Sequence, residues 1–131
     1  MKFDSKFEES LFLLLNGCAY HPDDRIAYYI PKMYEPDFLF VEDSKAIYIE
    51  AKGRFRTSEE ARKYIEIRNA LGKNEEIVFI FQNPKTPMPF AKRRKDGTRY
   101  NMEEWAIKNN FRYFTSDTVP EEWNETTSCN P

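Results

Sequence analysis

Two carboxylates and an ammonium group, close to one another in the sequence, have the clearest chemical potential in this chain. Asp37 opens one apolar run, residues 38–41, and Glu50 and Lys52 close the next one, residues 46–49. Alternate residues of a β-strand point to the same face, so we expect Glu50 and Lys52 on one side of their strand. Asp37, at the start of the neighbouring strand, is expected to lie across from them.

Such a group suits a hard divalent cation. Mg²⁺ takes oxygen ligands in octahedral geometry and keeps several waters, so two carboxylates and one main-chain carbonyl are enough. We expect Asp37, Glu50 and the carbonyl of Ala51 to be these ligands. A metal-bound water is a nucleophile near neutral pH, and the metal offsets charge that develops on a phosphate. Lys52 would orient that water or contact the phosphate.

The acid–x–lysine triplet alone is weak evidence for such a site. Residues 4–6 and 43–45 fit the same pattern, at an expected helix start and in an expected turn, where solvated charges are ordinary. From the pattern alone, a surface ion pair is the simpler interpretation of Glu50 and Lys52, and a metal site is the alternative.

Composition narrows the class of protein. The chain has 131 residues, 40% of them hydrophobic and 16% aromatic, which is enough for one folded domain and argues against disorder. A net charge of −2 gives no overall attraction to nucleic acid, so any DNA contact must come from local clusters. Two distant cysteines and one histidine supply neither a disulfide framework nor a zinc site. We therefore expect a soluble, cytoplasmic protein without a small-molecule cofactor.

The elements expected around these residues form an α/β fold. Capping residues and helical spacing predict helices, and β-branched and aromatic runs predict strands. The helices are expected at residues 4–16, 57–71 and 102–109, and the strands at 26–30, 37–42, 45–52, 76–82 and 111–114. The second and third strands should form a hairpin, and residues 45–82 a βαβ unit with parallel strands. In this scheme Ile49 and Ala51 face the core, and residues 124–131 form a flexible tail.

The segments "EPDF" (35–38) and "IEAKG" (49–53) together resemble the PD-(D/E)xK nuclease motif. An ordered series of further segments runs from "KFEESL" through "YYIP" and "IRNALGKNEEIVFIF" to "YNMEEWAIKNNFRYF" and "VPEEW", and covers roughly residues 5–123. With this series the sequence resembles the bacteriophage endonuclease I family of Holliday-junction resolvases, in the PD-(D/E)xK nuclease superfamily. This series is far more specific than the triplet, and it favours a nuclease over a surface ion pair.

The resemblance implies a single nuclease domain over residues 1–123, with a mixed β-sheet flanked by helices. It implies an intertwined homodimer that exchanges residues 1–30 between its subunits. The implied activity is Mg²⁺-dependent resolution of four-way and other branched DNA by paired cuts, with Mn²⁺ as a substitute metal and the cytoplasm of an infected bacterial cell as the location. The resemblance implies no interaction with a membrane.

The family's site residues fall by motif on a helix glutamate, the aspartate after proline, and the acid and lysine of the ExK motif. In this sequence they are Glu8, Asp37, Glu50 and Lys52. Glu9 is the alternative helix carboxylate. We prefer Glu8, because it borders the apolar side of the predicted helix.

A basic run at residues 91–99 stands out from the acidic remainder of the chain. A charge run is usually a solvated surface, but beside a nuclease site it is better interpreted as a phosphate-contacting patch. The expected DNA-contacting residues are Lys32, Arg54, Arg56, Lys92, Arg93, Arg94, Lys95 and Arg99. Two alternatives to junction resolution remain open: a related nuclease that nicks or cuts duplex DNA, and a non-catalytic branched-DNA-binding protein.

Overall fold

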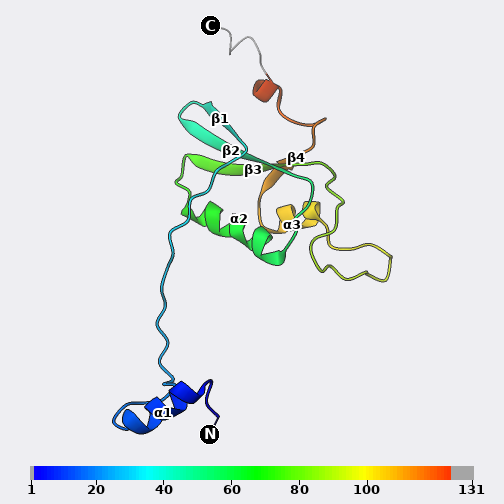
Figure 1. The fold of residues 1–131 in the computed structure, drawn as a ribbon. Helices are drawn as coiled ribbons and strands as arrows, with labels where there is room; N and C mark the ends of the chain where they lie inside the picture. Colours follow the sequence, from blue (N-terminus) through cyan, green and yellow to red (C-terminus); the bar gives the residue numbers. More distant parts are fainter. Residues whose placement is uncertain (1, 125–131) are drawn as a thin grey trace. The chain divides into compact units, whose positions relative to one another are not determined.

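The structure is a computed structural model, and it describes residues 2–124. The chain divides into two compact units, Met1–Lys32 and Met33–Pro131 (Figure 1). Of the tail expected at residues 124–131, only Asn124 falls within the described residues.

The first unit is built around the helix α1 (Lys6–Leu14). Ser5 caps this helix, because its hydroxyl accepts a hydrogen bond from the main-chain N–H of Glu8 at 3.0 Å. The helix is shorter than predicted at both ends. It buries no residue completely. Its best-packed side is an aromatic cluster of Phe3, Phe12 and Tyr20, with ring centroids 5.2 to 5.4 Å apart.

The prediction of a strand at residues 26–30 is wrong, because this segment is irregular and exposed. Its isoleucines and tyrosines have β propensity, which was the reason for the prediction. A strand also needs a neighbour for its main-chain hydrogen bonds. In the described chain no strand pairs with this segment.

The second unit is a four-stranded mixed sheet in the order β1-β2-β3-β4. The strands β1 (Phe38–Glu42) and β2 (Lys45–Lys52) form an antiparallel hairpin. The turn residues Asp43 and Ser44 both have positive φ, as in the tight turns that match strand twist. β3 (Glu75–Phe81) and β4 (Arg112–Phe114) continue the sheet in parallel. The hairpin and the βαβ unit are thus confirmed.

The helices α2 (Ser58–Ala70) and α3 (Met102–Lys108) are the two crossovers, and both cover the same face of the sheet (Figure 1). Thr57 and Asn101 are their N-caps, and the side chain of each accepts a hydrogen bond from the main-chain N–H three residues further on. A short 3₁₀ helix, Glu121–Asn124, follows β4. In the part of the chain that the structure describes, no helix has the length and apolar character that crossing a membrane requires.

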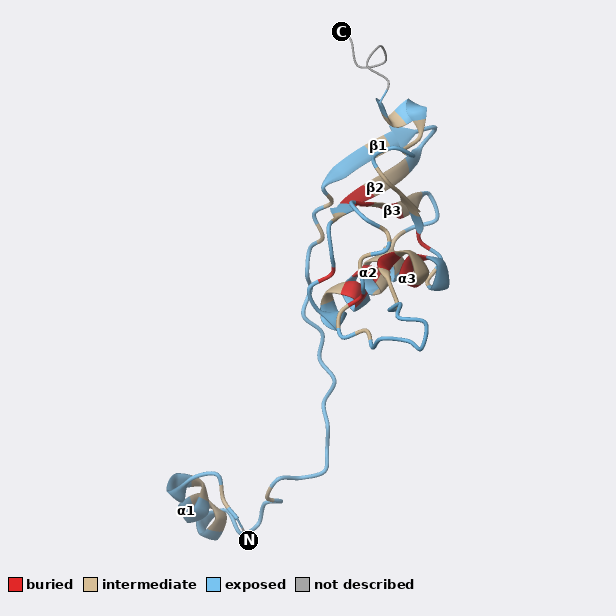
Figure 2. Ribbon diagram, turned by 90° about the vertical axis from the view of Figure 1, so that its right-hand side faces the viewer, coloured by how far each residue is buried: buried red, intermediate tan, exposed pale blue. Residues whose placement is uncertain are grey.

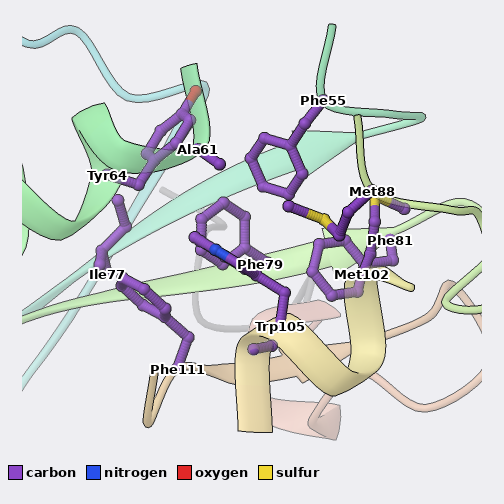
Figure 3. Packing of buried hydrophobic residues seen from close by; sticks show 11 residues of the cluster. Phe55, Ala61, Tyr64, Ile77, Phe79, Phe81, Met88, Met102, Trp105 and Phe111 are labelled. Atoms are coloured by element: carbon purple, nitrogen blue, oxygen red, sulfur yellow. The ribbon is translucent and has the colours of Figure 1, made fainter. Parts of the chain in front are cut away.

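The core lies between the sheet and these two helices, where the buried residues of Figure 2 are concentrated. Phe79 of β3 is at its centre and is completely buried. Its ring meets those of Tyr64 from α2, Trp105 from α3 and Phe55 at centroid distances of 5.2 to 5.9 Å (Figure 3). A core of this kind holds the sheet and both helices in one fixed arrangement.

The pairing of β2 with β3 corrects one expectation about side-chain direction. Glu50 lies beside Phe79, and Lys52 lies beside Phe81. Neighbouring residues in a sheet point to the same face, so both charged side chains point to the core face, and Ile49 and Ala51 point away from it. The expectation was reversed because it placed the charges on the solvated face by default, whereas hydrogen bonds from neighbouring residues allow them to be buried.

Candidate active site

Asp37 and Glu50 meet at the point where β2 approaches its C-terminal end. The hairpin register pairs Phe38 with Ile49, so Asp37 directly precedes the paired region and lies across from Glu50. The Oδ2 atom of Asp37 accepts a hydrogen bond from the main-chain N–H of Ala51 at 2.9 Å. This bond fixes the Asp37 carboxylate against β2.

Glu50 is the only buried charged residue in the described part of the chain, with 7% of its surface exposed. The hydroxyl of Tyr34 donates a hydrogen bond to its Oε1 atom at 2.6 Å. Burial raises the pKa of Glu50 and the nearby charge of Asp37 raises it further, although the Tyr34 hydrogen bond opposes both. Two ionised carboxylates in a poorly solvated site therefore destabilise the fold unless a cation binds beside them.

Lys52 lies between two carboxylates. Its Nζ atom is 3.4 Å from Oε2 of Glu60 and 4.0 Å from Oε2 of Glu50. The ammonium group also lies 5.0 Å from the ring centre of Tyr64. The side chains of Lys52 and Glu50 are only 14% and 9% exposed, so the ion pair considered from the pattern is present but is not a surface pair.

Glu60 orients Lys52 and is itself held in place. Its Oε1 atom accepts the main-chain N–H of Arg56 at 2.8 Å, and its Oε2 atom accepts from Lys52. Burial raises the pKa of Glu60, but the Arg56 N–H and the Lys52 charge outweigh it and hold the pKa below its ordinary value. Glu60 was not among the site residues expected from the sequence. Its main-chain N–H donates to the Thr57 hydroxyl at the start of α2, and its side chain contacts Lys52.

Tyr34 and Tyr64 are the other site residues that sequence reasoning missed. Tyr34 donates to Glu50, and the two tyrosine rings meet edge to face at 6.2 Å. Burial raises the pKa of each hydroxyl, and the Glu50 charge adds to this, so both remain protonated donors. The one available signal was the position of Tyr34, three residues before Asp37. Sequence position alone does not indicate where the Tyr34 side chain points.

Glu8 belongs to the first unit, and its contacts are with residues of that unit. Its Oε1 atom accepts a hydrogen bond from the Tyr20 hydroxyl and lies 3.1 Å from Nε2 of His21. Glu9 is exposed and makes no side-chain hydrogen bond among the described residues, so Glu8 is the more constrained of the two. Ligand atoms of Asp4, Glu8 and His21 lie close enough together to hold one cation. Exposed groups of acidic residues are, however, common in proteins without a bound cation. The meeting of Glu8 with the Asp37 group remains a prediction.

The residues expected to contact DNA are all exposed, and one of them is ion-paired. Arg94 donates from Nη2 to both carboxylate oxygens of Glu104, in α3, at 2.9 Å. The other seven make no ion pair within residues 2–124. They are Lys32, Arg54, Arg56, Lys92, Arg93, Lys95 and Arg99. Arg94 therefore fixes the basic loop, and the others are available to phosphates.

Comparison with known proteins adds no assignment to this geometry. No protein-family model matches the chain, and no curated protein matches its sequence. The site therefore has to be interpreted from its own residues.

The burial of Glu50 predicts a gain in stability when its charge is removed. In EDTA, Glu50→Gln is expected to raise the free energy of unfolding by about 1 kcal/mol, because the amide keeps the shape of the side chain and removes a buried charge that the nearby Asp37 carboxylate repels. Urea unfolding followed by circular dichroism measures this. Glu66→Gln, at an exposed position of α2, is the control and should change little. A loss of stability in Glu50→Gln alone would show that the carboxylate is a structural element.

Proposed function

We propose that this protein is a Mg²⁺-dependent endonuclease that cuts four-way and other branched DNA by paired strand cuts. One observation carries the proposal: Asp37 and Glu50 are held together at the end of β2, with Lys52 beside them on the same face of the sheet. The "EPDF" and "IEAKG" segments that supply them match a nuclease motif.

The donor set fits Mg²⁺, with Mn²⁺ as a substitute. Asp37 offers its second oxygen, Glu50 is a buried carboxylate with a raised pKa, and the main-chain carbonyl of Ala51 is a third oxygen. Hard oxygen ligands and the absence of any cysteine or histidine from this group favour Mg²⁺ over zinc. When bound, the metal supplies a nucleophilic water and offsets charge on the scissile phosphate.

The protein's own residues have separate tasks in this proposal. Asp37 and Glu50 hold the metal, and the Ala51 N–H keeps Asp37 in position. Tyr34 fixes the orientation of Glu50. Lys52 contacts a phosphate oxygen or the attacking water as a point charge, and Glu60 aims its ammonium group. Both Tyr34 and Glu60 are therefore positioning residues.

The DNA partner is supported by local charge and the homodimer by exposed apolar surface. Seven of the expected DNA-contacting cations make no ion pair within residues 2–124, and phosphate contacts position a protein without reading sequence. In the first unit Phe7, Leu13 and Leu14 are each more than 70% exposed. Exposed apolar surface of this kind marks interaction sites. A dimer with two-fold symmetry would place two sites on two strands of a junction.

The experiment that tests this function compares a labelled four-way junction with a duplex of the same arm sequence, both in Mg²⁺. We expect paired cuts near the branch point of the junction and little cutting of the duplex. Equal cutting of both substrates would favour a duplex nuclease. Junction binding without any cutting would favour a non-catalytic DNA-binding protein.

The basic loop gives a separate prediction about binding. Replacing Arg93 and Lys95 together with glutamine should weaken junction binding and reduce the log–log salt slope by about 1.8, since each duplex phosphate contact contributes about 0.9. Binding is measured in Ca²⁺ over a series of salt concentrations. Lys45→Gln with Lys73→Gln is the control, because it removes two charges near the N-terminal end of β2, of which Lys45 is paired with Glu76. If both double variants change the slope equally, the loop has no special contact with DNA.

A further inference from the structure

Phe90 combines two unfavourable features at one position. Its side chain is 89% exposed, and its backbone φ is +60°. The other non-glycine residues with positive φ in the described chain are His, Asp, Ser and Asn, which are polar. A left-handed conformation costs a bulky residue on the order of 1–3 kcal/mol. The fold therefore carries backbone strain at the same residue at which it exposes an aromatic ring.

The turn that carries Phe90 is firmly anchored. Met88 is buried, and its main-chain N–H donates to the carbonyl of Tyr100 at 2.8 Å. The N–H of Ala91 donates to the carbonyl of Met88 at 3.2 Å, which closes a tight turn around Phe90. The loop that begins here extends away from α3 (Figure 1). The ring is thus held out from a rigid base, and its exposure is not the result of a loose segment.

Positive charge lies on both sides of this turn. Lys92, Arg93 and Lys95 follow Phe90 in the chain and are exposed. Before it, Pro89 helps to line a hollow of about 340 Å³ between α2 and α3, whose lining also includes the exposed cations Arg62 and Lys108. An exposed aromatic ring flanked by cations is the arrangement that binds unstacked nucleobases together with their phosphates.

We propose that Phe90 stacks on a nucleobase left exposed at the branch point of DNA, while the neighbouring cations contact the flanking phosphates. This inference rests on the proposed function and adds a source of selectivity to it. A continuous duplex hides the faces of its bases in the stack, whereas a branch point exposes some of them. The ring therefore adds affinity for branched DNA and little for duplex.

The expected effect is measurable. Base–aromatic stacking contributes about 1–3 kcal/mol by alanine substitution, so Phe90→Ala should bind a four-way junction roughly 5- to 150-fold more weakly in Ca²⁺. Its affinity for a matched duplex should change less than twofold. Phe90→Trp keeps an aromatic face and should retain junction affinity. Phe90→Asn suits the left-handed backbone, so it should unfold at the same or a higher urea concentration than the native protein but bind the junction as weakly as Phe90→Ala.

A junction with 2-aminopurine at the branch point provides a direct readout. Stacking quenches the fluorescence of this base, so the native protein and Phe90→Trp should quench it, and the alanine and asparagine variants should not. If the native protein binds the junction and Phe90→Ala binds and quenches equally, the inference is wrong and the proposed function survives. If the native protein binds neither DNA, both are wrong. If Phe90→Ala lowers the mass in solution, measured by light scattering, Phe90 belongs to an interface between copies, and the stacking role is overturned.

Discussion

Lys52→Ala is expected to lower the rate of junction cutting by about 10²- to 10⁴-fold and to leave junction binding within a few-fold of the native protein. Lys52 is held between Glu60 and Glu50 at the end of β2, where its ammonium group can meet the attacking water or a phosphate oxygen. The loss of one fixed positive charge there affects the transition state more than the bound substrate.

Asp37→Ala and Glu50→Gln should reduce cutting to a similar extent for a different reason. Each removes one of the two carboxylates that would hold the metal. Junction binding in these variants should be retained or strengthened, because negative charge that repels phosphate is lost. Single-turnover cutting and binding in Ca²⁺ are measured on the same junction.

Lys63→Ala is the matched control for Lys52→Ala. The Lys63 ammonium group also lies 5.0 Å from the Tyr64 ring, but it makes no ion pair in the described chain. It should cut at the native rate. A Lys52→Ala variant that also cuts at the native rate would contradict the role given to the ExK motif.

The second large effect is the recovery of activity when two inactive variants are mixed. We expect that Glu8→Ala and Lys52→Ala are each inactive, and that nicking reappears after they are unfolded and refolded together. With exchange of residues 1–30, one site of a heterodimer combines native Glu8 from one chain with native Lys52 from the other. The second site carries both substitutions.

The structure supports such an exchange through the apolar residues that it leaves uncovered. The first unit exposes Phe7, Leu13 and Leu14, and the segment at residues 26–30 is exposed and pairs with no strand in the described chain. If each subunit kept its own first unit, every site in the mixture would carry one substitution, and the mixture would stay inactive. Light scattering provides a prior check, since a monomeric mass would rule out the homodimer.

Glu9→Ala is a useful companion to Glu8→Ala. Glu8 accepts from the Tyr20 hydroxyl, whereas Glu9 is exposed on the same helix. Glu9→Ala should therefore remain active by itself, without a second variant to restore its activity. If Glu9→Ala is inactive and Glu8→Ala is active, the helix carboxylate of the site is Glu9.

The hairpin of β1 and β2 and the helix α2 could be predicted because their signals are local. The Asp43–Ser44 turn fixes the register of β1 against β2, and that register alone brings Asp37 across from Glu50. The helix α2 was predicted within one residue at each end, because Thr57 caps its start and Gly72 follows its end. Signals of this kind depend on a few neighbouring residues, so they can be identified in a sequence.

The parts that could not be predicted depend on partners distant in the sequence. Glu50 could be assigned to the core face only once β3 was known to place Phe79 beside it. Tyr34 reaches Glu50 across sixteen residues. The segment at residues 26–30 has strand propensity but no strand partner, and propensity does not supply one.

The cutting of a four-way junction in Mg²⁺, compared with the same reaction in EDTA and in Ca²⁺, tests the central claim most directly. We expect paired cuts in Mg²⁺ or Mn²⁺, none in EDTA, and binding with little cutting in Ca²⁺, whose longer and looser coordination positions the attacking water poorly. Undiminished cutting in EDTA would contradict the claim that Asp37 and Glu50 hold a catalytic metal.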